Sequence, residues 1–309
     1  MKITSKALAQ SFAILAIGAI ALTGCTNASQ QQPSASSNGT ASFDPTSVAK
    51  DDTLAAAVPS AIKTRGTLIV GADTSYAPAE FLGGADGRTP QGYDVDLGKA
   101  IAATLGLKLE VQTADFNGIL PALGSKYDLG ISSFTINPER LKAVNMVSYF
   151  NAGVLWAVPK GNPKKFSLDD ICGKSIGVQT GTVEQDDVTA RSKKCTDAGK
   201  PAINVVSLAN QTDVTTRMVN GALDAMSADS PVTRYAISQT GDKLELLGAE
   251  TDAAKQGIAV AKANTEFADL ITKVVNKLIT DGSYKKVLES WSNTEGAIEK
   301  AELNPVAAS

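Results

Sequence analysis

The sequence predicts an α/β protein built from two lobes of similar size. Strand-like and helix-like stretches alternate from about Val58 onward, this alternation begins again in the second half of the chain, and polar residues gather where the predicted strands end. Such alternation is typical of a mostly parallel sheet with helices on both faces. Ligands of these sheets bind beyond the carboxyl ends of the strands, so the polar residues indicate a shared cleft.

The predicted elements of the first half follow one another at short spacing. Short apolar runs predict strands at residues 67–71, 108–111 and 127–132. Between the first two, residues 94–105 have the apolar spacing of an amphipathic helix, with Val95, Leu97, Ile101 and Leu105 available for its buried face. A short helix is predicted at residues 118–123. These elements form one α/β lobe.

The second half repeats the pattern. Strands are predicted at residues 175–179, 203–207, 222–227 and 257–260, and helices at residues 182–198, 212–220 and 267–280. The repeat predicts a second lobe of similar construction.

The composition excludes several classes of function. The chain of 309 residues carries a formal charge of −3, so it lacks the basic excess of a nucleic-acid binder. It contains no histidine, which rules out Ser-His or Cys-His nucleophile pairs and His-ligated metals. Common nucleotide-binding and zinc-binding patterns are missing. We therefore expect no nucleic-acid partner, no cofactor and no metal.

The N-terminus predicts an exported lipoprotein. Lys2 and Lys6 precede an apolar run over residues 11–22, which is typical of a secretory signal and short for a membrane span. The sequence at residues 22–25, Leu-Thr-Gly-Cys, resembles the bacterial lipobox, in which the cysteine takes the lipid. This implies a signal peptide over residues 1–24. A plain cleaved signal or a transmembrane anchor is the alternative.

The region behind the predicted lipid is polar. Residues 26–42 are rich in Ser, Gln, Asn and Ala and cannot bury apolar surface, which predicts a flexible tether over residues 25–57. The protein would then be extracytoplasmic and would contact the cell membrane only through the lipid on Cys25.

Two further cysteines, Cys172 and Cys195, are 23 positions apart. Outside the cytoplasm such a pair is typical of a disulfide. The alternative is two buried free thiols.

Seven segments resemble the family 3 extracellular solute-binding proteins, the amino-acid receptors of ABC importers. In chain order they are GTLIVGADTSYAP, GYDVDLGKAIA, DFNGILPALGSKYDLGISSFTINPER, GKSIGVQTGT, NGALDAMSADSP, GIAVAKAN and ITDGSYKKVLESW. Each segment alone is a weak signal, but their order and spacing are specific, and they span most of the chain from about Arg65 to Trp291.

This resemblance implies a two-lobed, periplasmic-binding-protein-like fold of type II, with mixed, mostly parallel sheets joined by a two-strand hinge. The chain would cross between the lobes near residues 156–158 and 256–257. The implied organisation is lobe one over residues 58–156 plus 257–295, lobe two over residues 157–256, and a C-terminal tail over residues 296–309.

The implied function is the substrate-binding component of an ABC importer. It would capture an amino acid by hinge closure, act as a monomer and pass the ligand to a permease. Asp73 and Glu184 would face the ligand side chain, and two carboxylates there favour a cationic or polar ligand such as arginine, lysine or ornithine.

An amino acid needs one fixed cation and one fixed anion. Arg140 can grip the carboxylate through two parallel hydrogen bonds, and Asp229 would hold the ammonium. The alternatives are a surface arginine near a helix start and an N-cap aspartate.

The remaining candidates surround these anchors. Ser133 and Thr135 end a predicted strand, and the Thr180-Gly181-Thr182 turn starts a predicted helix, which favours an anionic group. Thr182 could instead be a plain N-cap. Tyr76 and Phe116 are candidate aromatic walls, although such residues often belong to the core.

Two other functions stay open. A dehydratase acting on cyclic diene acids shares this fold, and Asp73 or Glu184 could be its general acid. A substrate without an α-ammonium would not need both anchors, and turnover of prephenate or arogenate would distinguish it. A ligand sensor is the second alternative; with no membrane or kinase segment seen after Ser309, it would need a separate signalling partner.

Overall fold

The computed structural model describes residues 43–306 of the chain. The predicted signal peptide, Cys25 and most of the predicted tether lie outside these residues. Within residues 43–306, no helix combines the length and the apolar character that crossing a bilayer requires.

The larger sheet contains eight strands in the order β5-β1-β6-β11-β7-β10-β8-β9. Its strands are β1 (Thr67–Ala72), β5 (Lys108–Thr113), β6 (Leu129–Gly130), β7 (Val144–Pro159), β8 (Ser175–Gln179), β9 (Asn204–Leu208), β10 (Ala225–Asp229) and β11 (Leu244–Ala261). The pairs on both outer sides are parallel, whereas β7 and β11 are antiparallel to each other and to their neighbours β10 and β6. The predicted α/β class is confirmed.

A smaller antiparallel sheet lies beside it. It consists of β2 (Ser75–Tyr76), β3 (Glu80–Gly83) and β4 (Thr89–Gln91), in that order. The sequence did not predict these strands, because they are only two to four residues long and lack a clear alternating pattern.

The helices cover the strands and connect them. They are α1 (Asp52–Ala56), α2 (Ser60–Arg65), α3 (Tyr93–Thr104), α4 (Phe116–Ile119), α5 (Pro138–Ala143), α6 (Val183–Asp197), α7 (Gln211–Val219), α8 (Ser230–Gln239), α9 (Thr265–Thr280) and α10 (Ser283–Ser290). Short 3-10 helices are η1 (Pro45–Ser47), η2 (Leu120–Ala122), η3 (Leu168–Asp170), η4 (Gly241–Lys243) and η5 (Thr294–Gly296). The most regular amphipathic helix is α9, which buries Phe267, Ile271, Val274 and Leu278.

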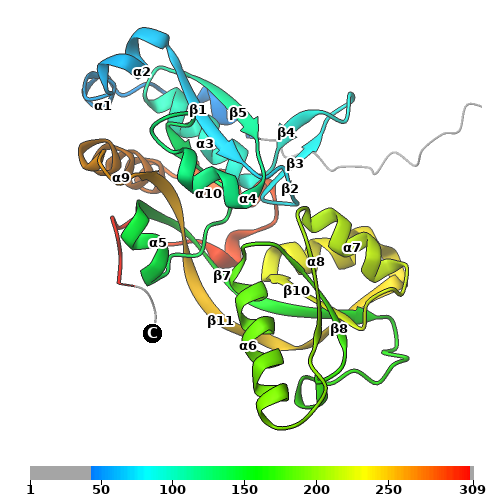
Figure 1. The fold of residues 1–309 in the computed structure, drawn as a ribbon. Coiled ribbons are helices and arrows are strands. Elements are labelled where there is room, and N and C mark those ends of the chain that lie inside the picture. Colours follow the sequence, from blue (N-terminus) through cyan, green and yellow to red (C-terminus); the bar gives the residue numbers. More distant parts are fainter. Residues whose placement is uncertain (1–42, 307–309) are drawn as a thin grey trace, which may run out of the picture. The chain divides into compact units, whose positions relative to one another are not determined.

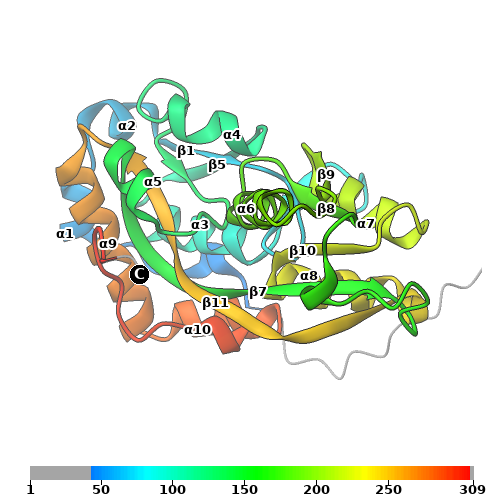
Figure 2. The same cartoon turned by 60° about the horizontal axis from the view of Figure 1, so that its bottom comes forward.

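The long strands β7 and β11 link the two halves of the sheet. Figure 1 shows them running together from the part that holds β1, β5 and α3 to the part that holds α6, α8 and β8, and Figure 2 shows the same pair from another side. Their pairing shifts register between Leu247 and Ala254 and again after Gln256. Because both strands continue through the middle, they join the two halves into one eight-stranded sheet, as expected for sheets linked by two strands.

The hydrophobic core is divided along these two strands. Along β7, Ala152 packs with the cluster around α3 and α9, whereas Trp156 packs with the cluster around β8 and α6. Along β11 the change falls between Leu247 and Ile258. Each part of the protein therefore has most of its apolar interior to itself, although Ala228 on β10 and Val232 on α8 pack with the first cluster.

Two terminal segments are more ordered than the sequence predicted. Within the expected tether, η1 and α1 are capped by Asp44 and Asp51, and the Asp51 amide bonds the carbonyl of Thr104 on α3. Within the expected tail, the Ser148 amide on β7 bonds the carbonyl of Glu302. These backbone bonds attach the N-terminal segment to α3 and the C-terminal segment to β7.

Cys172 and Cys195 form the predicted disulfide, with their Cα atoms 5.6 Å apart. Cys172 follows η3, and Cys195 lies near the end of α6. The bond closes a loop that includes β8 and most of α6, so it restricts the unfolded chain over that whole segment.

Replacing both cysteines by alanine should lower the free energy of unfolding by about 3 kcal/mol, because the loop of 23 positions is no longer closed in the unfolded state. Urea titration followed by circular dichroism measures this. Reduced wild-type protein serves as the control and should match the variant, whereas an unchanged unfolding midpoint would argue against a stabilising role.

Candidate functional site

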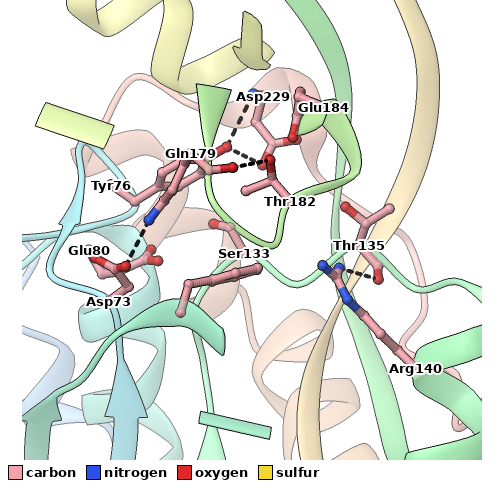
Figure 3. A pocket seen from close by; sticks show the side chains of 11 residues that line it. Asp73, Tyr76, Glu80, Ser133, Thr135, Arg140, Gln179, Thr182, Glu184 and Asp229 are labelled. Atoms are coloured by element: carbon pink, nitrogen blue, oxygen red, sulfur yellow. Dashed lines mark hydrogen bonds between the residues drawn. The ribbon is translucent and has the colours of Figure 1, made fainter. Parts of the chain in front are cut away.

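A narrow pocket lies where β1, β6, β8 and β10 end (Figure 3). Its lining residues are Asp73, Tyr76, Glu80, Phe116, Ser133, Thr135, Arg140, Gln179, Thr182, Glu184 and Asp229. Nine of these were predicted as site residues, while Glu80 and Gln179 were missed. The cavity measures about 10 Å³, room for roughly one water. Among residues 43–306, no group of acidic or cysteine side chains is arranged to hold a metal.

Arg140 brings positive charge to the pocket from α5. Asn137 caps this helix by accepting a hydrogen bond from the Arg140 amide, which leaves the guanidinium free to turn inward. The guanidinium donates to the Thr135 carbonyl over 2.9 Å and to the Gly181 carbonyl over 3.2 Å. It therefore bridges the two halves of the sheet and does not cap its own helix.

Arg140 also lies over aromatic rings. Its Cζ is 5.4 Å from the centre of the Phe116 ring and 5.7 Å from that of Phe134, and the two rings stack at 4.7 Å. These contacts fix the plane of the guanidinium. Phe116 thus serves as a wall of the pocket and as packing for Arg140.

Asp229 ends β10 and stands at the start of α8. Its side chain makes no capping bond. Its Oδ2 instead accepts hydrogen bonds from the Tyr76 hydroxyl and from Gln256 Nε2, each over 2.9 Å. Tyr76 belongs to β2 and Gln256 to β11, so the carboxyl group is held by two other strands and faces the pocket.

Asp73 follows β1, and its carboxyl group accepts a hydrogen bond from Gln179, which ends β8 in the other half of the sheet. Gln179 Nε2 donates to Asp73 Oδ2 over 2.7 Å and to the Ala209 carbonyl over 3.0 Å. The sequence placed Gln179 at the end of a strand, and the strand-end rule already applied to Ser133 would have identified it.

Polar residues complete the lining. Ser133 has a left-handed backbone, with φ of 49°, and its amide donates to Asp94 Oδ2. Thr135 pairs with Gln256 in an isolated bridge, which exposes its carbonyl to Arg140. Thr182 caps α6 through its Oγ1 and also donates to the Gln179 carbonyl.

Thr180 and Gly181 are not among the lining residues. The Thr180 hydroxyl lies 2.6 Å from Ser207 Oγ, toward β9. Gly181 has a left-handed φ of 83°, and a Cβ there would fall 1.7 Å from Asn117 Oδ1 on α4. Gly181 contacts the site through its carbonyl, which accepts a hydrogen bond from Arg140.

Acidic side chains outnumber basic ones in this pocket. Asp73, Glu80, Glu184 and Asp229 are all buried, and among the described lining residues Arg140 is the only basic one. Burial raises the pKa of all four carboxyl groups above their ordinary values. The charge of Asp94 adds to the rise at Glu80, and that of Glu184 adds to the rise at Asp229.

Residues 68–294 match the family described as bacterial extracellular solute-binding proteins, family 3. The arginine-binding protein ArgT of Corynebacterium glutamicum is 31% identical over 305 residues, which cover 98% of this chain and 97% of ArgT. The relationship therefore extends along almost the whole of both proteins.

Solved structures of amino-acid-binding proteins are also similar to this chain. An ancestral arginine-binding protein bound to arginine superposes with a TM-score of 0.67 at 37% identity, covering 74% of this chain and 98% of that one. The ancestral amino-acid-binding protein AncCDT-1, a precursor of cyclohexadienyl dehydratase, has a TM-score of 0.64 at 31% identity, with coverage of 75% and 97%.

The unliganded protein should be more stable near pH 5.5 than near pH 8. A carboxyl group with a raised folded-state pKa takes up a proton on folding, so its stabilising contribution is lost as the pH rises through that pKa. Calorimetry at both pH values should show a higher melting temperature at pH 5.5. The melting temperature shifts by roughly 2–4 °C for each 1 kcal/mol of change in the free energy of unfolding.

Glu80→Gln is the matched variant for this measurement. It removes one of the titrating groups and should flatten the pH profile. A melting temperature that rises from pH 5.5 to pH 8 in the wild-type protein would contradict the raised pKa of these buried carboxyl groups.

Proposed function

Because the chain belongs to family 3 of the bacterial extracellular solute-binding proteins, we propose that it captures a cationic amino acid for an ABC importer. Arginine is the first candidate, followed by lysine and ornithine. The observation that carries this choice is the excess of acid in the pocket, where four buried carboxyl groups accompany one basic side chain. The relative ArgT, named as an arginine-binding protein, supports the same choice.

Arg140 and Asp229 serve as anchors for the α-carbon of the ligand. A carboxylate would replace the carbonyl of Gly181 or Thr135 as the acceptor for the guanidinium, with a stronger, charge-assisted bond. An ammonium would lie against Asp229, whose Oδ2 is already held in place by Tyr76 and Gln256. Opposite charges then meet opposite charges at both ends of the amino-acid backbone.

The side chain of the ligand has a separate acidic end to reach. Asp73 follows β1 of the large sheet and Glu80 begins β3 of the small sheet, and the two lie together next to Gln179 (Figure 3). Two buried carboxyl groups without a basic partner are costly when ionised. A guanidinium or ammonium group would supply the missing positive charge, whereas an aliphatic or acidic side chain would not.

Binding requires the lobes to separate and close again. The present cavity is far smaller than the roughly 300–1,000 Å³ of usual small-molecule pockets. Direct bonds between the halves, such as Gln179 to Asp73 and Arg140 to Gly181, occupy the groups that would hold the ligand. We place the hinge in β7 near residues 156–158 and in β11 near residues 256–257, and the lobes at residues 58–156 plus 257–295 and 157–256. A ligand that bonds to both lobes favours the closed form.

The same proposal covers location and partners. The lipobox-like sequence supports export, lipid attachment at Cys25 and an extracytoplasmic location at the cell membrane. The protein would act as a monomer, because a closing cleft needs no second copy, and its partner would be an ABC permease that recognises the closed form.

A dehydratase activity is less favoured. The likeness to a dehydratase precursor concerns a protein that is itself named as amino-acid-binding. The pocket also combines Arg140 with Asp229, and a substrate without an ammonium group would leave Asp229 without a partner of opposite charge. We therefore propose binding without turnover.

Arg140→Ala should weaken L-arginine binding by at least about 100-fold, or ~3 kcal/mol, because the ligand carboxylate loses its charge-assisted bonds in a buried site. Isothermal titration calorimetry measures the dissociation constant. Arg140→Lys should also bind weakly, since an ammonium group cannot reproduce the two parallel bonds.

Arg217→Ala is the control for this loss of charge, because Arg217 is exposed on α7, outside the pocket lining. It should bind like the wild-type protein. Normal binding by a folded Arg140→Ala protein would remove Arg140 from the site.

Selectivity provides an independent check. L-Arginine, L-lysine or L-ornithine should bind more tightly than L-glutamate and L-leucine. Glu80→Gln should weaken binding of the cationic amino acids by roughly 10-fold or more, because one charge partner is lost. Calorimetry with this panel decides the matter, and a clear preference for glutamate or leucine would refute a cationic ligand.

A further inference from the structure

A second carboxyl group stands directly behind Glu80, outside the pocket lining. Glu80 begins β3 and is 0% exposed, while Asp94 lies in the first turn of α3 and is 1% exposed. Each carboxyl group has one oxygen that is well bonded. Glu80 Oε1 accepts from Ser132 Oγ over 2.7 Å, and Asp94 Oδ2 accepts from the Tyr149 hydroxyl over 2.7 Å.

The other two oxygens have no donor within the described residues. Glu80 Oε2 and Asp94 Oδ1 are both buried, and neither receives a hydrogen bond from any described group. The two residues are, however, neighbours: the Asp94 amide donates to the carbonyl of Ala79, the residue directly before Glu80, over 2.9 Å. Their carboxyl groups act on each other's pKa through a side-chain hydrogen bond. Two acceptors can bond only if one of them carries a proton, so a single shared proton would satisfy both oxygens.

Among residues 43–306, no basic side chain is bonded to either carboxyl group, whose donors are Ser132, Ser133 and Tyr149. The titratable groups that act on Glu80 or Asp94 are acids or phenols, and they come from four different elements: Asp73 after β1, Tyr93 on α3, Tyr149 on β7 and Asp229 at the end of β10. Two adjacent carboxylates in such a setting cannot both ionise without a large cost.

We propose that Glu80 and Asp94 hold one proton between them in the unliganded protein and release it when a cationic side chain binds beside Glu80. This inference rests on the proposed function, because it needs a positive group at the acidic end of the pocket. Asp94 is then a positioning residue. It does not line the pocket, but it sets the charge that Glu80 presents to the ligand.

The direction of the pH effect follows from the shared proton. Burial raises the pKa of Asp94 to about 6 and that of Glu80 well above its ordinary value. Where the unliganded pair keeps its proton, binding must expel it, so affinity falls as the pH is lowered. The affinity changes by up to about tenfold per pH unit for one proton released.

The test is calorimetry of L-arginine binding to the full-length protein at pH 5.5, 6.5 and 7.5, each in buffers with different ionisation enthalpies. The dependence of the observed heat on the buffer gives the number of protons released. Asp229 and Glu184 also titrate, so the informative quantity is the difference between the wild-type protein and Asp94→Asn.

Asp94→Asn replaces the shared proton by a permanent donor. The new amide can donate to Glu80, while its oxygen can still accept from Ser133 and Tyr149. We expect close to one proton fewer to be released than by the wild-type protein at pH 6.5, and a flatter affinity profile between pH 5.5 and 7.5. Asp96→Asn on the same helix, which removes a charge bonded to Lys99 and Trp291, should behave like the wild-type protein.

Tyr149→Phe is a second variant in case Asp94→Asn folds poorly. It removes a donor to Asp94 Oδ2, which should hold the proton more tightly and move proton release to higher pH. Equal proton release by the wild-type and the folded Asp94→Asn protein, or no release at any pH, would overturn the proposal of a shared proton and leave the proposed function intact. Failure of L-arginine, L-lysine and L-ornithine to bind at any pH would overturn the proposed function as well.

Discussion

The site depends on an imbalance of charge. Arg140 is the only basic side chain among the described residues that line the pocket, and it faces four buried carboxyl groups. Such a pocket is costly to ionise when closed on itself and gains most from a partner that brings positive charge. A cationic amino acid brings two positive groups and one negative group, which matches the excess of acid and still leaves a carboxylate for Arg140.

The fold supplies this imbalance by bringing strand ends from both halves of one sheet to the same place. Asp73 and Ser133 follow parallel strands of the first half, and Asp229 ends a strand of the second. The long strands β7 and β11 join the halves, and most of the apolar core is divided between the two sides. Under the proposed hinge motion, the pocket would open while most of each interior stays packed, and a ligand would replace direct bonds between the halves such as that from Arg140 to Gly181.

The sequence predicted most of the pocket because Arg140, Asp229 and Thr182 lie in segments that resemble the solute-binding family, INPER, SADSP and QTGT. Local pattern alone would have left Arg140 as a surface residue at a helix start. Glu80 was missed because it begins a short strand in a small sheet that has no clear periodicity. The side chains of Gln179 and Thr180 bond in opposite directions because consecutive residues at a strand end point to opposite faces, and only the register shows which one faces the cleft. The contact of Glu80 with Asp94 depends on tertiary packing and leaves no signal in the sequence.

A crystal structure with bound L-arginine tests the central claim most directly. The account predicts the α-carboxylate on the Arg140 guanidinium, the α-ammonium on Asp229, and the ligand guanidinium between Asp73 and Glu80, with the bonds from Arg140 to Gly181 and from Gln179 to Asp73 broken or rearranged. A bound ligand that leaves Arg140 and Asp229 bonded only to protein groups, or one whose guanidinium lies away from both acids, would contradict it.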